Sequence, residues 1–312
     1  MSRPTVAVVV PAYNRATMVS ETIESILAQS HPADEIIVVD DGSTDATLEV
    51  LERYRNSIRI LEQPNSGVAV ARNRGIRAAT ADWIALVDSD DRWQPNFLSC
   101  CLGIAEGDPE AELIYTRYHR WSGTRLLPNP ALGEPPGTNP LRKLLHLRQL
   151  CSASSCMIKR SAILSAGAFN EQRDLHPSED WECWTRLAIR GVKFGFSPEP
   201  CAWVRVHGGN TMSDPPRMER SMLRALDAII AQASEPQRHQ IRRELLGSIL
   251  MRSAVGFYGV GKTRPALQRL MQGAIYRPRL PLQEPLWAWT LLRCLLGDQL
   301  STRLRNLKYD RT

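Results

Sequence analysis

The chain has 312 residues, of which 43% are hydrophobic and 23% are charged, and it carries a net charge of +6. This composition is typical of a soluble globular protein and excludes an intrinsically disordered or fibrous chain. No uninterrupted apolar stretch approaches the roughly 20 residues that a membrane-spanning helix needs, and the first apolar run is too short for a secretory signal, so neither is expected.

The first 87 residues alternate between expected strands and helices. Apolar runs typical of buried parallel strands occupy residues 5–10, 36–40, 58–61 and 83–87. Apolar residues at helical spacing predict helices at 18–30, through Leu48 and Leu51, and at 68–79. Strand alternating with helix predicts an α/β fold with a doubly wound, mostly parallel sheet that is flanked by helices.

Polar loops follow three of these strands. They read PAYNR after the first strand, DDGSTD after the second and DSDD after the fourth. Ligands of doubly wound sheets bind beyond the carboxyl ends of the strands, so the three loops are expected to converge on one crevice. No GxGxxG follows the first strand and no GxxxxGK[ST] occurs anywhere, so dinucleotide and P-loop chemistry are not expected.

The DSDD loop concentrates negative charge directly after a buried strand. Asp88, Asp90 and Asp91 lie within four positions, and Arg92 comes only after them. Carboxylates so close together repel one another, and burying even one is costly unless a positive charge compensates it. The cluster is therefore either a solvated loop tip or a binding site for a cation that is not part of the protein.

Five motifs occur in order along the chain. They are PAYN at 11–14, VVDDGSTD at 38–45, NSGVAVARNRG at 65–75, DSDD at 88–91 and SEDWECWTRL at 178–187. Together they make the chain resemble the family 2 glycosyltransferases of the GT-A fold over about two thirds of its length. The resemblance implies a GT-A catalytic domain over residues 1–214, with a nucleotide-sugar half to about 115 and an acceptor half from about 116. Residues 215–312 would then form a helical C-terminal extension.

The resemblance also implies which residues bind the donor. Tyr13 and Asp41 would hold the nucleobase, and a UDP-sugar is the default donor because a carboxylate can accept the N3 proton of uracil. Asp88 would face the ribose, and Arg72 the phosphate or ribose. The full predicted donor set is Pro11, Ala12, Tyr13, Asn14, Asp41, Arg72, Asp88 and Ser89. On the residues alone, Asp41 could instead be an Asx-turn residue before Gly42, and Arg72 a solvated helix position.

A metal site and a catalytic base complete the implied set. Asp90 would ligate Mn²⁺ or Mg²⁺ at the donor phosphates, because hard oxygen ligands suit these cations, and the cation would supply the charge missing from DSDD. His207, in WVRVHGGN, would be a second ligand, with a surface histidine as the alternative. Asp180, in SEDWECW, would deprotonate the acceptor hydroxyl, and Glu179 is the neighbour that could be mistaken for it.

The seven cysteines are scattered and show no zinc-ligand spacing. Cys100 and Cys101 are adjacent, and Cys151 and Cys156 stand five apart. This usage predicts reduced thiols in a cytosolic protein.

The C-terminal part is basic. Residues 215–312 contain 17 Lys and Arg against 7 Asp and Glu, a charge of +10, whereas residues 1–214 carry −4. Trp, Leu and basic residues combine within 285–312, which fits a helix lying in the interface of an anionic membrane. Packing on the catalytic domain or on a homodimer partner is the alternative. No nucleic-acid motif occurs, so a nucleic-acid partner is not expected.

The sequence therefore predicts an inverting, metal-dependent, non-processive glycosyltransferase. It would act in the cytoplasm, peripherally on the inner face of the membrane, and extend a lipid-linked or cell-surface glycan. The alternatives are a catalytically inactive scaffold on a transferase fold and a nucleotidyltransferase. The presence of Asp90 and Asp180 disfavours the scaffold, and the lack of a glycine- and lysine-rich opening loop disfavours nucleotidyl transfer.

Overall fold

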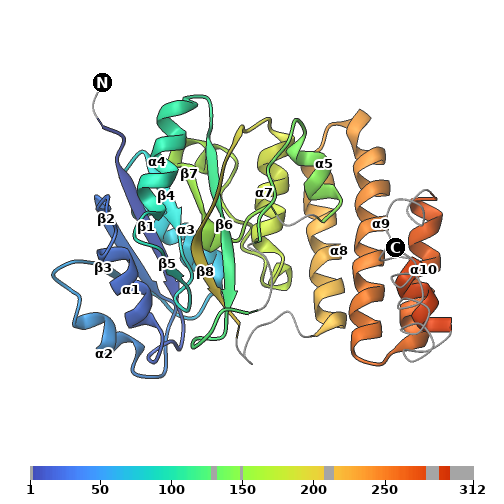
Figure 1. Cartoon of the computed structure of the whole chain (residues 1–312), viewed down its shortest axis with the longest axis horizontal. Coiled ribbons are helices and arrows are strands. Elements are labelled where there is room, and N and C mark those ends of the chain that lie inside the picture. The colour runs from blue at the N-terminus through green and yellow to red at the C-terminus, as the bar shows by residue number, and fades with distance from the viewer. Residues whose placement is uncertain (1–2, 128–131, 148–149, 207–213, 279–287, 296–312) are drawn as a thin grey trace, which may run out of the picture. The chain divides into compact units, whose positions relative to one another are not determined.

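The computed structural model of the chain describes residues 3–127, 132–147, 150–206, 214–278 and 288–295 (Figure 1). The chain divides into two compact units. Unit 1 comprises the described residues of 1–144, 148–173 and 179–210, and unit 2 those of 145–147, 174–178 and 211–312. The assignment of residues 1–214 to catalysis, with its two halves, stays a prediction.

The described strands of unit 1 form one mixed sheet in the order β3-β2-β1-β4-β7-β6-β8-β5. The neighbours β3, β2, β1 and β4 run parallel, as do β6 and β8, whereas β7 and β5 pair antiparallel to their neighbours. The strands are β1 (Val6–Ala12), β2 (Glu35–Asp40), β3 (Arg59–Glu62), β4 (Trp83–Leu86), β5 (Arg92–Trp93), β6 (Leu113–Trp121), β7 (Cys156–Lys159) and β8 (Phe194–Arg205).

Helices cover both faces of this sheet, as Figure 1 shows. The helices α1 (Val19–Leu27), α2 (Thr47–Glu52) and α4 (Phe97–Gly107) share one apolar core with the sheet. The helices α3 (Val68–Ala78), α6 (Arg160–Ser165) and α7 (Glu179–Ile189) share the other, and α5 (Pro140–Leu145) contributes Leu144 to it. The predicted class, a mostly parallel α/β sheet flanked by helices, is confirmed.

Strand β1 shows why its sequence is apolar without alternation. Val6, Val8 and Val10 lie in the core beside α1, and Ala7 and Val9 lie in the core beside α3. Successive side chains of a strand point to opposite faces, so a strand with helices on both sides buries all of them. The strand also continues two residues past the expected end at residue 10, with its last two residues still paired in parallel with β2.

Unit 2 contains the helices α8 (Pro215–Gln232), α9 (Glu235–Gly259) and α10 (Thr263–Tyr276), which lie side by side in Figure 1. Arg269 pairs with the nearly buried Glu219 at 2.5 Å, which ties α10 to α8. The C-terminal helical extension expected from the sequence is thus present. Among the described residues, no helix combines the length and the apolar composition that a membrane span requires.

The segment predicted to lie on a membrane is described only over residues 288–295, which are helical. Leu291 and Cys294 pack against the core cluster of Met251, Ala254 and Leu270. This part of the segment therefore packs on α9 and α10 of the C-terminal extension. The sequence prediction did not consider this contact.

Candidate active site

The three polar loops meet at the carboxyl edge of β1, β2 and β4, as expected. The backbone N–H of Asn14 donates to Ser43 Oγ at 3.0 Å, and Asn14 Oδ1 accepts the N–H of Thr44 at 2.8 Å. Asn14 has a φ of 52°, a left-handed conformation that Asn tolerates better than most residues. Arg15 reaches the third loop, where its Nε donates to Asp90 Oδ2 at 3.2 Å.

Asp41 joins the second loop to the start of α3. Its buried carboxylate accepts Gln63 Nε2 at 2.7 Å and the backbone N–H groups of Ser66 and Gly67, both at 2.8 Å. A carboxylate has about four acceptor positions, and these three donors leave one of them. The next residue, Gly42, has a φ of +74°, and a Cβ there would lie 2.7 Å from a backbone nitrogen of the NSG loop. The turn therefore requires glycine.

The other residues of the first loop differ in what they offer a ligand. Pro11 and Ala12 are the last residues of β1 and are buried, and the Ala12 carbonyl accepts the Asp41 N–H at 2.8 Å. Tyr13 is 42% exposed. Of these three, only Tyr13 exposes its side chain to solvent, and its contact with a nucleobase stays a prediction.

Part of the charge that compensates DSDD comes from inside the protein. Arg72 on α3 is buried, and it donates from Nη2 to Asp88 Oδ1 at 2.7 Å and from Nη1 to Glu179 Oε1 at 3.0 Å. Burial lowers the pKa of Arg72. The carboxylates of Asp88 and Glu179 raise it by more, so the pKa lies above its ordinary value. Arg72 is therefore not a solvated helix position. The expectation that the cluster depends on an external cation alone is incomplete.

Asp90 is the carboxylate of this loop that the sequence predicts to bind a divalent cation. Its side chain is 16% exposed and pairs with Arg15. Mg²⁺ bound with a nucleotide uses one or two protein carboxylates together with phosphate oxygens, so this all-oxygen donor suits such an ion. Ser89 is buried beside it. His207, the other predicted metal ligand, lies outside the described residues.

Asp91 anchors the loop through hydrogen bonds within the protein. Its buried carboxylate accepts the Ser154 hydroxyl at 2.5 Å and the backbone N–H of Arg205 at 2.7 Å. Burial, followed by the charges of Asp90 and Asp88, raises the pKa of Asp91 well above its ordinary value. Ionisation of Asp91 is therefore unfavourable in the folded protein. The buried position of this carboxyl group lowers the stability of the protein at pH values where Asp91 loses its proton.

Asp91→Asn is expected to stabilise the protein at alkaline pH. A raised folded-state pKa contributes stability at low pH that is lost as pH rises through that pKa, and Asn has no proton to lose. The amide can still accept the Arg205 N–H and donate to Ser154 Oγ. Urea unfolding from pH 5 to pH 9 should show the variant's advantage growing with pH. An Asn variant that is less stable than the wild type at pH 9 would contradict this account.

Asp180 lies in the first turn of α7 with a half-buried carboxyl group. Its Oδ1 accepts the backbone N–H of Trp181 at 2.6 Å. Burial, and then the charge of Glu179, raise the pKa of Asp180 to about 7, although Arg72 opposes them. A carboxylate with this pKa is suited to general base catalysis near neutral pH. Glu179 pairs with Arg72, so the two neighbours that the sequence could confuse have different environments.

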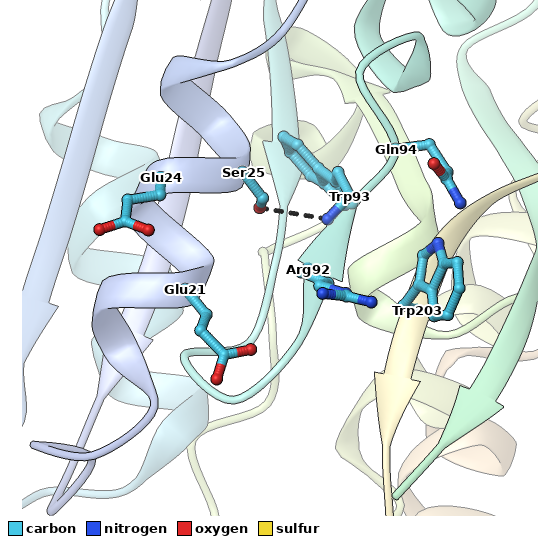
Figure 2. Close-up of a pocket in the computed structure, with 7 residues that line it drawn as sticks. All are labelled: Glu21, Glu24, Ser25, Arg92, Trp93, Gln94 and Trp203. Carbon is cyan, nitrogen blue, oxygen red and sulfur yellow. Dashed lines mark hydrogen bonds between the residues drawn. The ribbon is translucent and has the colours of Figure 1, made fainter. Parts of the chain in front are cut away.

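A pocket of about 380 Å³ lies between α1, β5 and β8 (Figure 2). Its lining residues are Glu21, Glu24, Ser25, Arg92, Trp93, Gln94 and Trp203. None of the predicted site residues that the structure describes lines it. Arg205 links it to the DSDD loop, because its Nη2 donates to Glu21 Oε2 and its Nε donates to the Asp90 carbonyl, both at 2.8 Å.

Sequence reasoning missed Arg15, Ser154 and Arg205 as residues that hold the DSDD loop. Arg15 directly follows PAYN, and its position is the one local signal available. Ser154 and Arg205 are 63 and 114 positions from Asp91, so no local pattern could find them.

Comparisons of sequence agree with this arrangement. The sequence model of Glycosyl transferase family 2 matches residues 7–165. The putative teichuronic acid biosynthesis glycosyltransferase TuaG of Bacillus subtilis is 43% identical over 101 residues, which are 31% of this chain and 40% of TuaG. An uncharacterized glycosyltransferase of Rickettsia felis is 44% identical over 217 residues, 67% of this chain and 34% of that protein. The chain therefore spans well under half the length of these relatives.

Solved structures share the fold at low sequence identity. S. aureus TarS 1-349 in complex with UDP-GlcNAc has a TM-score of 0.68 and 20% identity, covering 98% of this chain and 92% of that one. The mannosyltransferase PcManGT from Pyrobaculum calidifontis, in complex with GDP-Man and Mn²⁺, has a TM-score of 0.62 and 19% identity, covering 98% and 88%. With a GT-A type sheet, converging polar loops and a family match over half of its length, the chain belongs to glycosyl transferase family 2.

Proposed function

We propose that the protein is an inverting, metal-dependent, non-processive glycosyltransferase that moves a sugar from a nucleotide-diphosphate donor to a lipid-linked or cell-surface glycan. The observation that carries the proposal is Asp180, a half-buried carboxyl group of pKa about 7 beside the Arg72–Asp88 pair. It is the group in this site with the basicity that the reaction needs at neutral pH.

The donor would lie along the carboxyl ends of β1, β2 and β4. Tyr13 offers an exposed ring, Asp41 keeps one acceptor position beside Gln63, and Asp88 is held toward the site by Arg72. UDP-GlcNAc in the TarS complex and GDP-Man in the PcManGT complex support a nucleotide-sugar donor. Among these donors a UDP-sugar is proposed, because the one acceptor position that three protein donors leave on Asp41 matches the single ring N–H of uracil, whereas guanine presents a ring N–H and an amino group side by side.

The proposed chemistry is a single displacement. The acceptor hydroxyl gives its proton to Asp180 while its oxygen forms a bond to the anomeric carbon. The bond from that carbon to the donor phosphate breaks on the opposite face, so the configuration at the carbon inverts. Asp90, with His207 as a proposed second ligand, would hold Mn²⁺ or Mg²⁺, which supplies charge stabilisation for the departing diphosphate.

Asp90→Ala tests the donor half of the proposal. Purified protein should hydrolyse or transfer from one of a panel of UDP-, GDP- and dTDP-sugars only when Mn²⁺ or Mg²⁺ is present. The Ala variant should lose the metal-dependent part of nucleotide diphosphate binding, measured by calorimetry, while its circular dichroism stays that of the wild type. Unchanged Mn²⁺-dependent affinity in the variant would remove Asp90 from the metal site. A panel with no active donor would sink the proposed function.

The proposed acceptor is a glycan, and the proposed cellular site is the inner face of the membrane. The name of TuaG refers to teichuronic acid biosynthesis, which supports a glycan acceptor. A lipid-linked acceptor would favour peripheral attachment at the inner face of the membrane through the basic segment 285–312. The packing of Leu291 and Cys294 on α9 and α10 limits how much of that segment can reach lipid. A homodimer is the remaining proposed partner.

Deleting residues 285–312 should release the protein from anionic liposomes. Attraction to such lipids is worth about 1 kcal/mol for each basic residue near the surface, and the segment carries several. Flotation of full-length and truncated protein with anionic and with neutral vesicles measures the difference. Equal flotation of the two proteins with anionic vesicles would refute membrane attachment through this segment.

A further inference from the structure

Helix α4 and strand β8 bring two thiols and a carboxylate together at one surface of unit 1. One ligand atom each from Cys100, Glu199 and Cys201 lies within 4.8 Å of the others. Cys100 comes from α4, and the other two residues come from β8. The thiols of Cys100 and Cys201 are in hydrogen-bonding contact. About a hundred positions separate the two cysteines, which is why the sequence shows no metal-ligand spacing.

An irregularity in β8 places the two β8 ligands. The pairing of β6 with β8 shifts twice between Ser197 and Ala202, so β8 carries extra residues relative to its partner there. Bulges of this kind bend a strand and aim particular side chains. Residues 199 and 201 are two positions apart, and both reach toward α4. The bulge thus presents a carboxylate and a thiol to the same helix.

Neighbouring polar groups hold this cluster in place. Ser197 Oγ accepts the Cys100 thiol at 3.0 Å and the Glu199 N–H at 3.2 Å, and Asn96 Nδ2 donates to Glu199 Oε2 at 3.1 Å. At Gly195, a Cβ would lie 2.7 Å from a side-chain carbon of α4, so helix and strand approach closely. Cys201 is buried and Glu199 is exposed, which leaves one side of the cluster open to an ion from solvent.

We propose that Cys100, Cys201 and Glu199 form a Zn²⁺ site that clamps α4 to β8. Zn²⁺ takes thiolate and carboxylate ligands in tetrahedral geometry, with bonds of about 2.3 Å to sulfur and about 2.0–2.2 Å to oxygen. Two sulfurs on one zinc ion then lie about 3.8 Å apart, so small side-chain movements convert this cluster into a site. Each thiol that binds releases its proton to solvent, and water completes the fourth position.

The site is distinct from the metal site proposed at Asp90. Thiolates select zinc and softer ions, whereas an all-oxygen site suits Mg²⁺ and Mn²⁺. From Cys201, β8 runs on to Arg205, which holds the backbone of Asp90 and the side chain of Asp91. Zinc would therefore stiffen the strand that supports the DSDD loop. Zinc binding at this site is independent of the transfer reaction, so a protein that binds no zinc here could still have the proposed function.

Cd²⁺ titration of the full chain, reduced and stripped of metal with a chelator, tests the site. Cd²⁺ bound to thiolate gives an ultraviolet charge-transfer band, and oxygen ligands such as Asp90 give none. One equivalent should saturate the band, and Zn²⁺ should abolish it by displacement. Cys100→Ser should lose the band. Glu199→Gln should weaken Cd²⁺ affinity at least about tenfold, since even losing a residue that supports a ligand costs about 10–100-fold.

Cys294→Ser is the matched control, because it removes a partly exposed thiol from unit 2 and should leave the titration unchanged. Zn²⁺ should also raise the Tm of the wild type and of this control, but not that of Cys100→Ser. Glu199 is exposed, so its variant reports on the site even if a cysteine variant folds poorly. A band that survives in Cys100→Ser, or Cys100 alkylation that is equally fast with and without Zn²⁺, would overturn the proposal.

Discussion

Asp180→Asn is expected to lower turnover by roughly 10²–10⁴-fold, the usual cost of losing a general base. Asn keeps the size of the side chain and can still accept the Trp181 N–H, so the start of α7 should not change. The predicted donor contacts, Tyr13 and Asp41 among them, come from other loops. Steady-state kinetics should therefore show a lower kcat with a nearly unchanged donor KM, the pattern of an interaction made only in the transition state.

The pH profile gives a second readout of the same variant. The base must be deprotonated to act, and burial together with Glu179 raises the pKa of Asp180 to about 7. The kcat/KM of the wild type should then fall about tenfold for each pH unit below 7, and this acid limb should be absent from the Asn variant. A normal turnover, or an acid limb that persists in the variant, would place the base elsewhere.

Glu179→Gln is the informative control. Because the charge of Glu179 raises the pKa of Asp180, its removal should move the acid limb to lower pH while turnover at pH 8 stays close to the wild type. The variant should also be less stable, since Arg72 loses a buried anionic partner. If Glu179→Gln lost more turnover at pH 8 than Asp180→Asn, the base would be Glu179.

The strands of the sheet could be predicted from local runs of apolar residues. The apolar run at 5–10 is buried on both sides in β1, and the strands expected at 36–40, 58–61 and 83–87 correspond to β2, β3 and β4. The converging loops followed from the general rule that parallel strands end on one edge. Hydrophobic periodicity reports burial directly, which is why these features could be read from the chain.

Pairings across long sequence separations could not be read in this way. Arg72 and Glu179 are 107 positions apart, and the sequence alone left Arg72 between a phosphate ligand and a solvated helix position. Its burial depends on how α3 and α7 pack on the same face of the sheet. Charge compensation at DSDD likewise depends on Arg15 and Arg72, which only the folded chain brings to Asp90 and Asp88.

Arg72→Met is expected to lower the free energy of unfolding by about 3–5 kcal/mol at pH 7, the typical cost of removing one partner of a buried ion pair. Glu179 has a side chain that is only 7% exposed, so it would remain buried without its counter-charge. Met should fill the apolar space beside Phe169, whose ring centre lies 5.3 Å from the guanidinium carbon. Urea unfolding at pH 7 measures the loss.

The double variant Arg72→Met/Glu179→Met separates lost charge pairing from lost packing. Replacing both members of a buried pair with apolar residues is often neutral or stabilising, so the double variant should recover most of the stability that the single variant loses. If the single variant were within about 1 kcal/mol of the wild type in stability, the pair would contribute no more than a weak surface ion pair.

Arg72 also lowers the pKa of Asp180. In Arg72→Met the acid limb of kcat/KM should therefore move to higher pH, opposite to its movement in Glu179→Gln, because the two residues act on Asp180 with opposite charge.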